Sequence, residues 1–198
     1  MNSALIAHSY FYLGALDVAL LTCYLPEWVG TFFQNPEKGA ERRDRGSYAV
    51  LLASMFAGIL FAFFTAFGAP VASITWQQPL VFWTGIALML AGAAFRWYAI
   101  KLLGKFFTRS VATRTGQYVV ATGPYRLIRH PSYSGALLTI LGLGLAMTNW
   151  ISLVLVLLGA LIGYGYRVRV EERALCAGIG DAYREYMQCT RRFIPYVW

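Results

Sequence analysis

Long apolar stretches separated by shorter polar connections dominate the pattern of this chain. The apolar runs cover approximately residues 4–25, 48–67, 80–100, 131–147 and 150–166. An α-helix needs about 20 mostly apolar residues to cross the hydrocarbon core of a bilayer, and these runs approach or reach that length. We therefore predict an all-α integral membrane protein with five transmembrane helices in a single domain.

The connection between the last two apolar runs consists of Thr148 and Asn149. Because such a short connection makes neighbouring helices run antiparallel, the last two spans are predicted to form a tight helical hairpin. The two open ends of this hairpin, at His130 and Arg167, are then expected to lie close together.

Beyond residue 166 the chain is polar, but its apolar and aromatic side chains recur at a helical spacing. These side chains are Leu175, Ile179, Tyr183 and Tyr186. Their spacing of i, i+4, i+8 and i+11 is typical of one face of an α-helix. The last membrane helix is therefore predicted to continue as an amphipathic cytoplasmic helix, loosened near Gly178 and Gly180.

Lys and Arg residues are concentrated in alternate connections, namely 34–47, 101–129 and the segment after residue 166. The N-terminal segment and the connections 68–79 and 148–149 contain neither residue. Since Lys and Arg favour the cytoplasmic side of a membrane, the N-terminus is predicted to lie outside and the C-terminus in the cytoplasm. The N-terminal segment also lacks a basic region and a clear cleavage site, so it is expected to begin the first span rather than a cleaved signal.

Composition agrees with a membrane protein and excludes other classes. The chain is 58% hydrophobic and only 13% charged, with a mean hydropathy of +0.53, whereas soluble domains carry about 25% charged residues. The net charge of +8 follows from the topology, so no nucleic-acid partner is predicted. The three cysteines, an odd number without metal-ligand spacing, indicate neither a metal site nor a disulfide framework.

Polar chemistry is concentrated in two clusters, at 116–135 and 167–173, which the hairpin is expected to bring together. Pro131 suits the first position of a helix, where the N–H groups of Ser132 and Tyr133 would favour an anion. Tyrosine rings in the first cluster offer faces for a cation, and the second contains two acidic residues. The alternative is that Arg129 and His130 are interfacial anchors and that residues 171–173 are a solvated helix start.

The order of these motifs resembles a known family. GPYRLIRHPSYSG, an apolar hairpin, RVRVEERAL, GIGDAYREYMQ and RRFIP follow one another within about 110–195. This set resembles the isoprenylcysteine carboxyl methyltransferase family and its relatives, which include phospholipid N-methyltransferases. The resemblance implies a membrane-embedded methyltransferase that uses S-adenosylmethionine, yields S-adenosylhomocysteine and has no Rossmann fold. The single domain is then expected to consist of three N-terminal spans, 1–100, and a cofactor-binding catalytic region, 101–198.

The resemblance also implies a set of site residues. The expected cofactor-binding residues are Gln117, Tyr118, Val119, Val120, Tyr125, His130, Pro131, Ser132, Tyr133 and Glu171. The arginine on the substrate side of the family's site matches Arg167. No metal ligand is implied.

The implied reaction is in-line methyl transfer, which depends mainly on proximity and orientation. A carboxylate acceptor, as in an isoprenylcysteine, is already nucleophilic and would need only positioning by Arg167. An amine acceptor, as in a phospholipid, would need a base such as Glu171 or Glu172. The lipophilic acceptor is expected to arrive from the bilayer and the cofactor from the cytoplasm.

Parts of the sequence also agree with two other functions. Membrane sterol reductases, which use NADPH, share a motif like RRFIPY, but they usually carry an acidic residue where this chain has Ala136 after Gly135. A non-enzymatic protein that binds anionic lipid headgroups through basic loops is the other alternative, and it would leave the two polar clusters unexplained.

Overall fold

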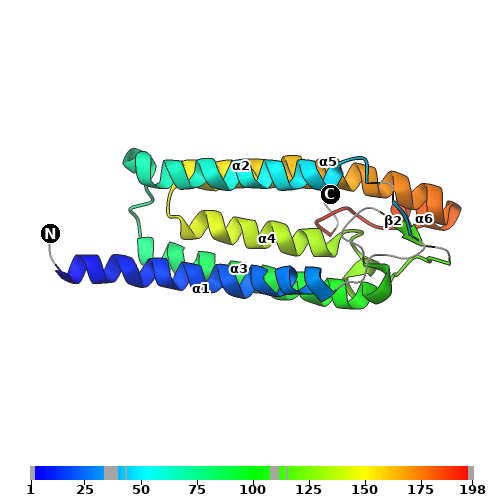
Figure 1. Cartoon of the computed structure of the whole chain (residues 1–198), viewed down its shortest axis with the longest axis horizontal. Helices are drawn as coiled ribbons and strands as arrows, with labels where there is room; N and C mark the ends of the chain where they lie inside the picture. Colours follow the sequence, from blue (N-terminus) through cyan, green and yellow to red (C-terminus); the bar gives the residue numbers. More distant parts are fainter. Residues whose placement is uncertain (1–2, 34–39, 43, 108–111, 115, 196–198) are drawn as a thin grey trace.

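Long helices lying side by side form the body of the protein in the computed structural model, which describes residues 3–33, 40–42, 44–107, 112–114 and 116–195 (Figure 1). The described elements are α1 (Ser3–Phe33), β1 (Ala40–Arg42), α2 (Ser47–Gly68), η1 (Pro70–Ala72), α3 (Gln78–Leu103), η2 (Gly104–Phe106), β2 (Ala112–Arg114), η3 (Gly123–Arg126), α4 (Pro131–Ala146), α5 (Trp150–Ile179) and α6 (Asp181–Cys189). The helical nature of the fold is as predicted.

The helix boundaries agree with the apolar pattern except at the end of α1. This helix was expected to end near residue 25, but it continues through Pro26 to Phe33. Proline removes one backbone hydrogen bond from a helix, a loss that helices in membranes often accommodate. Proline alone was therefore an unreliable stop signal.

Not all five predicted spans are equally long and apolar. Within the part of the chain that the structure describes, α2, α3 and α5 are long and apolar enough to cross a membrane. The apolar parts of α1, Tyr10–Pro26, and of α4, Pro131–Ala146, are shorter. The number of five spans therefore stays a prediction.

Glycines allow the helix pairs α3–α4 and α2–α5 to approach closely. A Cβ atom on Gly92 of α3 would lie 2.5 Å from the backbone nitrogen of Thr139 in α4. A Cβ on Gly159 of α5 would likewise lie 2.5 Å from the carbonyl oxygen of Ser54 in α2. Small residues are typical of helix contacts in membranes. Because α4 also packs against α5, these contacts fix the two helices that carry the polar clusters.

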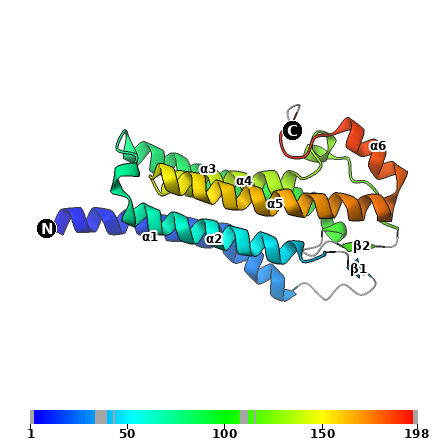
Figure 2. The ribbon, with the colours of Figure 1, turned by 90° about the horizontal axis from the view of Figure 1, so that it is seen from above.

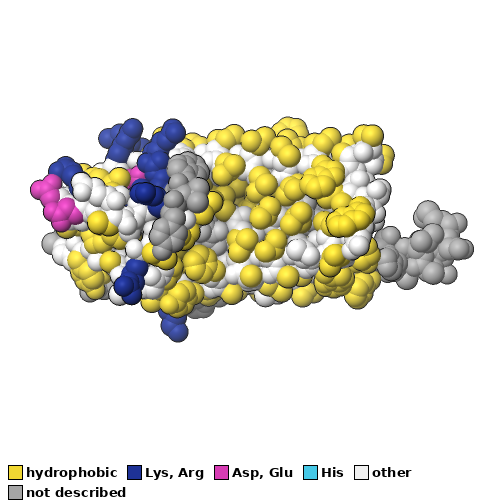
Figure 3. Space-filling view, turned by 180° about the vertical axis from the view of Figure 1, so that it is seen from behind, with side chains coloured by type: hydrophobic (Ala, Val, Ile, Leu, Met, Phe, Trp, Pro, Cys, Tyr) yellow, Lys and Arg dark blue, Asp and Glu magenta, His cyan; other side chains and the backbone are white. Residues whose placement is uncertain are grey.

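The outer surface of the bundle separates into an apolar part and a charged end. Hydrophobic side chains cover most of the face seen in Figure 3, whereas Lys and Arg side chains gather at the end where α6 lies (Figures 1 and 3). Exposed apolar side chains on the long helices include Phe56, Phe64, Leu158 and Ile162. This distribution suits a protein surrounded by lipid with one polar end in water.

A small sheet joins two connections that the sequence analysis treated as separate loops. Strands β1 and β2 pair antiparallel, with Glu41 opposite Thr113. The remaining parts of these predicted connections, 34–39, 43, 108–111 and 115, lie outside the described residues. The pairing ties the segment before α2 to the segment before α4, near the polar end of the bundle.

The predicted polar extension of the last membrane helix consists of two helices. Helix α5 continues to Ile179, and the chain turns at Gly180, which has a φ of 80°. Helix α6 then leads into a segment, 190–195, that returns to the start of α4 (Figure 2). There the backbone N–H groups of Arg129 and His130 donate to the carbonyl oxygens of Arg191 and Arg192 at 2.7 and 3.1 Å.

Candidate active site

The two polar clusters meet at the polar end of α4 and α5, as the sequence predicted. We call the shared residues His130, Tyr133, Arg167, Glu171 and Glu172 the hairpin cluster. Tyr133 donates to Glu171 Oε2 at 2.6 Å, and Arg167 Nε donates to the Tyr133 hydroxyl at 2.9 Å. One phenol therefore connects the buried guanidinium to the carboxylate of Glu171, whose side chain is 28% exposed.

His130 occupies the position just before α4 and is buried against Tyr133. The two rings are stacked, with centroids 5.5 Å apart and planes 9° apart. The His130 Nδ1 atom lies 3.9 Å from Glu171 Oε2, and its Nε2 atom lies 3.5 Å from Glu172 Oε1. The Nε2 atom is buried without a hydrogen bond to any described residue. Buried polar atoms are rarely left in this state, so Nε2 is a candidate contact for a ligand.

The start of α4 differs in one detail from the predicted anion site. Pro131 takes the expected first position of the helix, and Ser132 is buried. The backbone N–H of Tyr133, which was expected to face an anion, donates instead to the carbonyl oxygen of His130 at 3.0 Å. The N–H of Tyr133 is therefore used within the first turn of α4, whereas the sequence predicts that it binds an anion.

Glu172 is buried and holds two arginines. Arg129 Nε lies 2.9 Å from one of its carboxylate oxygens, and Arg192 Nη2 lies 2.8 Å from the other. The hydrogen bonds from Arg192 to Glu172 raise the pKa of Arg192 above its ordinary value. Arg129 also donates to the carbonyl oxygens of Met187 and Thr190. Glu172 therefore fastens the C-terminal segment to the start of α4, a contact that the sequence did not reveal.

Asp44 and Ser47, just before and at the start of α2, extend the cluster. Arg167 Nη1 donates to Asp44 Oδ1 at 3.1 Å and to Ser47 Oγ at 3.2 Å, and all three residues are buried. The sequence predicts Asp44 to lie in a polar loop and gives it no place in the site. A useful signal was its position three residues before Ser47, since Asp is typical of helix starts. Its Oδ2 atom indeed accepts from the backbone N–H of Tyr48 at 3.3 Å.

Tyr125, predicted to contact the cofactor, is buried between other parts of the protein. Its hydroxyl donates to the carbonyl oxygen of Ala99 at 3.3 Å, and its own carbonyl accepts from Tyr186 at 2.7 Å. Burial raises the pKa of the Tyr125 phenol. In this arrangement Tyr125 supports the backbone ahead of α4, and its contact with a cofactor stays a prediction.

The other predicted cofactor contacts lie in a segment without regular secondary structure. These residues are Gln117, Tyr118, Val119 and Val120. The ring of Tyr118 is largely exposed and packs edge-on against Phe106, with centroids 4.9 Å apart. Their part in a cofactor site therefore stays a prediction. Among the described residues, no group of His, Cys, Asp and Glu side chains is arranged to hold a metal ion.

Comparison with known proteins agrees with the resemblance in the sequence. Residues 85–177, which include the whole hairpin cluster, match the model of the isoprenylcysteine carboxyl methyltransferase (ICMT) family. This match confirms the resemblance to that family. Together with the apolar helices, it identifies an integral membrane protein.

Individual relatives match over larger parts of the chain. Protein-S-isoprenylcysteine O-methyltransferase B of Arabidopsis thaliana is 30% identical over 57% of this chain and 58% of its own length. The cobalt-zinc-cadmium resistance protein CzcN of Cupriavidus metallidurans is 32% identical over 78% of this chain and 64% of its own. The chain thus spans roughly three fifths of the length of these relatives.

A solved structure shares the fold. The eukaryotic intramembrane Ras methyltransferase ICMT superimposes with a TM-score of 0.58 at 21% sequence identity. The match covers 96% of this chain and 64% of that protein. The helices of this chain are therefore arranged as in the matched part of ICMT.

Proposed function

We propose that the chain is a membrane-embedded methyltransferase that transfers a methyl group from S-adenosylmethionine to a lipophilic acceptor. The observation that carries the proposal is the hairpin cluster itself. Acidic, aromatic and imidazole groups converge at the polar end of two apolar helices, within the region that matches the ICMT family. A site at this position can be reached from water and lies beside the lipid-facing surface.

The proposal includes the membrane topology. We infer five spans, with the N-terminus outside, the C-terminus in the cytoplasm and the site on the cytoplasmic face. The gathering of Lys and Arg at the end where α6 lies supports this orientation. In one domain, residues 1–100 supply three spans and residues 101–198 supply the catalytic region.

The residues of the hairpin cluster fit the proposed cofactor. The Nε2 atom of His130, which makes no hydrogen bond to a described residue although it lies 3.5 Å from Glu172 Oε1, and the partly exposed carboxylate of Glu171 are suited to the polar groups of S-adenosylmethionine. The full set proposed to hold the cofactor is Gln117, Tyr118, Val119, Val120, Tyr125, His130, Pro131, Ser132, Tyr133 and Glu171. When bound, the cofactor would supply an electrophilic methyl group, and the residues of this chain would orient it and exclude water.

The contacts of Arg167 refine its predicted role towards the acceptor. Its guanidinium is already bound by Asp44, Ser47 and the Tyr133 hydroxyl. An acceptor carboxylate would reach Arg167 only in competition with Asp44. We therefore infer that Arg167 chiefly orients Tyr133, and through it Glu171, while adding positive potential that attracts a carboxylate.

The nature of the acceptor decides whether a base is needed. With the carboxylate of an isoprenylcysteine-type substrate, which the names of several relatives favour, no proton has to be removed. With a phospholipid amine, the alternative acceptor, Glu171 is the better base of the two acids. Glu172 is less suitable because protonating it would break its ion pairs with Arg129 and Arg192.

A methyl-transfer screen tests the proposal. The purified full chain, in detergent and in liposomes, is incubated with S-adenosylmethionine carrying a radiolabelled methyl group. The acceptors offered are an S-farnesylcysteine derivative, phosphatidylethanolamine and a small thiol. We expect label in the farnesylcysteine, released as methanol by mild base because the product is an ester, whereas an N-methyl product resists base.

A matched pair of variants makes the screen specific. Glu171→Gln should abolish most of the transfer, while Arg126→Gln, at an exposed position outside the hairpin cluster, should retain it. Absence of label in all three acceptors would contradict the proposed substrates. Equal transfer by wild type and Glu171→Gln would contradict the proposed site.

A further inference from the structure

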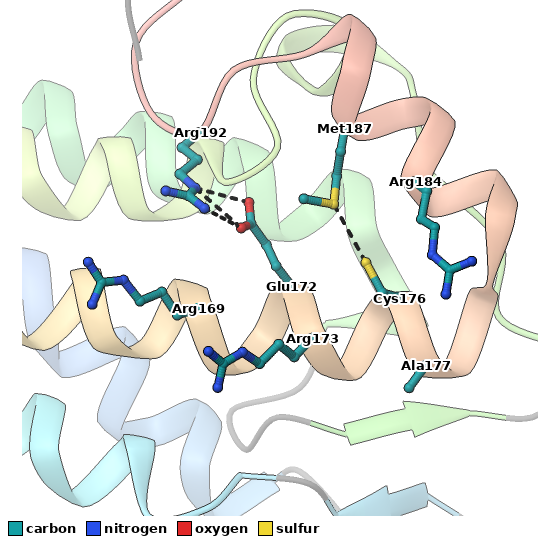
Figure 4. A pocket seen from close by; sticks show the side chains of 8 residues that line it. All are labelled: Arg169, Glu172, Arg173, Cys176, Ala177, Arg184, Met187 and Arg192. Atoms are coloured by element: carbon teal, nitrogen blue, oxygen red, sulfur yellow. Dashed lines mark hydrogen bonds and ion pairs between the residues drawn. The ribbon is translucent and has the colours of Figure 1, made fainter.

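A pocket rich in arginine lies beside the hairpin cluster, between the polar end of α5, helix α6 and the C-terminal segment. Its volume is about 550 Å³. Arg169 and Arg173 project from α5, Arg184 projects from α6, and Arg192 comes from the C-terminal segment (Figure 4). We call these four residues and the space between them the arginine pocket. None of the four has a function predicted from the sequence.

The charges of the arginine pocket are only partly balanced. Arg192 forms an ion pair with Glu172, and the same carboxylate also binds Arg129. One negative charge therefore faces two positive charges. Arg184 is paired with Asp181 in a contact that is largely exposed to water. Arg169 and Arg173 make no ion pair with any residue that the structure describes. Like charges within one pocket repel each other, so the site is energetically suited to an anion.

Guanidinium groups select the chemistry of that anion. Arginine presents a planar set of N–H donors that matches the oxygens of a phosphate group, and such contacts are frequently bidentate. The side chains of Arg169 and Arg173 are one helical turn apart, which places them on the same face of α5. They are exposed and can reach a ligand without breaking a contact within the described chain.

The position along α5 indicates how a phosphate group would arrive. Ile162 and Tyr166 are exposed apolar and aromatic side chains on the same helix, just before Arg169. At 1.5 Å per residue, the step from Tyr166 to Arg169 is only about 5 Å along the helix axis. If α5 crosses the bilayer, the arginine pocket lies at the level where the apolar surface ends and lipid headgroups begin.

We propose that the arginine pocket binds a phosphate group, supplied either by the headgroup of an anionic phospholipid or by a soluble phosphate. The proposal stands on the charge and geometry of the pocket and does not depend on methyl transfer. It remains testable if the protein transfers no methyl group, because every readout below measures binding.

The main variant is Arg169→Gln/Arg173→Gln in the full chain. Its matched control is Lys101→Gln/Arg126→Gln, which removes the same charge from two exposed positions outside the pocket. Because all four residues are exposed, both variants should elute and unfold like the wild type. If the main variant does not fold, Arg169→Lys/Arg173→Lys keeps the charge but loses the bidentate geometry, and it should weaken binding to an intermediate degree.

Two arms distinguish the sources of phosphate. In the first, a fluorescent short-chain phosphatidylglycerol is titrated into detergent-solubilised protein, with phosphatidylcholine as the neutral comparison. In the second, inorganic phosphate is tested for protection against thermal unfolding, relative to chloride at equal ionic strength. A basic residue near a membrane surface strengthens binding of anionic lipid by roughly fivefold, so the main variant should bind phosphatidylglycerol at least tenfold more weakly.

Each outcome decides the proposal. A loss of phosphatidylglycerol binding in the main variant alone would identify a lipid headgroup, and a loss of protection by phosphate in the main variant alone would identify a soluble ligand. An equal loss in main and control variants would show diffuse surface attraction and overturn the proposal. Binding that is unchanged in the main variant, or absent from the wild type in both arms, would also overturn it.

Discussion

Replacing Asp44 with alanine tests whether the segment before α2 belongs to the site. Asp44 accepts hydrogen bonds from Arg167 and Ser47, and it is only 5% exposed. The substitution leaves the guanidinium of Arg167, itself 3% exposed, buried without its nearest carboxylate. Arg167 keeps its hydrogen bonds to Ser47 and to the Tyr133 hydroxyl, so it does not lose all of its polar partners.

The magnitude follows from the burial of both partners. Removing one partner of a buried ion pair costs about 3–5 kcal/mol, and the remaining contacts of Arg167 place the expected cost near the lower end, at about 3 kcal/mol. For a chain of this size, about 2–4 °C of melting temperature corresponds to 1 kcal/mol. Asp44→Ala should therefore lower the melting temperature by roughly 6–12 °C.

A double-mutant cycle isolates the interaction. Thermal unfolding in one detergent is measured for the wild type, Asp44→Ala, Arg167→Met and the double variant. Removing both charges costs far less than leaving one of them buried without its partner. The double variant should therefore be more stable, by at least about 1.5 kcal/mol, than the sum of the two single effects predicts. Asp181→Ala, which removes a largely exposed ion pair with Arg184, is the control and should cost at most about 1 kcal/mol.

The result that refutes this reasoning is additivity. If the single effects sum to the double effect within about 0.5 kcal/mol, Asp44 and Arg167 do not interact, and Asp44 has no place in the site. A small effect of Asp44→Ala, equal to that of Asp181→Ala, would lead to the same conclusion.

Three further predictions concern helix packing, the cofactor site and the C-terminal region. Gly142→Ala should destabilise the fold in thermal unfolding, because its Cβ would lie 2.5 Å from backbone atoms of α3, whereas Gly165→Ala, with open space around it, should not. Equal melting temperatures would refute the α3–α4 contact. Glu171→Gln should weaken calorimetric binding of S-adenosylhomocysteine at least tenfold while the melting temperature stays within a few degrees, and unchanged affinity would exclude Glu171 from the cofactor site. Burial raises the pKa of Tyr186 from 10.0 to about 12, so the folded state keeps the phenolic proton at a pH where the unfolded state has lost it. The contribution of Tyr186 to stability therefore falls as the pH rises from about 10 to about 12. In chemical denaturation across this pH range, the free energy of unfolding should fall less for Tyr186→Phe than for the wild type. If it falls equally with pH in both proteins, the burial of the Tyr186 phenol is contradicted.

Local patterns in the sequence predicted the helices and the meeting of the polar clusters. Apolar runs located α2 to α5 within a few residues, and helical spacing extended α5 into the polar region, with the break at Gly180. The short connection after α4 predicts that His130 and Arg167 lie at the same end of the hairpin. These features depend on periodicity and chain length, which a single sequence carries.

Long-range contacts could not be predicted in the same way. The pairing of β1 with β2, the ion pair between Asp44 and Arg167, and the attachment of the C-terminal segment by Glu172 join residues far apart in the sequence. Charge alone does not identify the partner, since Arg and Lys residues are numerous in the polar connections. For this reason the sequence predicts Glu172 as a candidate base but does not predict its ion pairs with Arg129 and Arg192.

Calorimetry of the purified full chain tests the central claim most directly. The protein in detergent is titrated with S-adenosylhomocysteine and, in a separate experiment, with NADPH. The proposed methyltransferase should bind S-adenosylhomocysteine with a Kd in the micromolar range and give no binding heat with NADPH. Binding of NADPH without binding of S-adenosylhomocysteine would contradict the account.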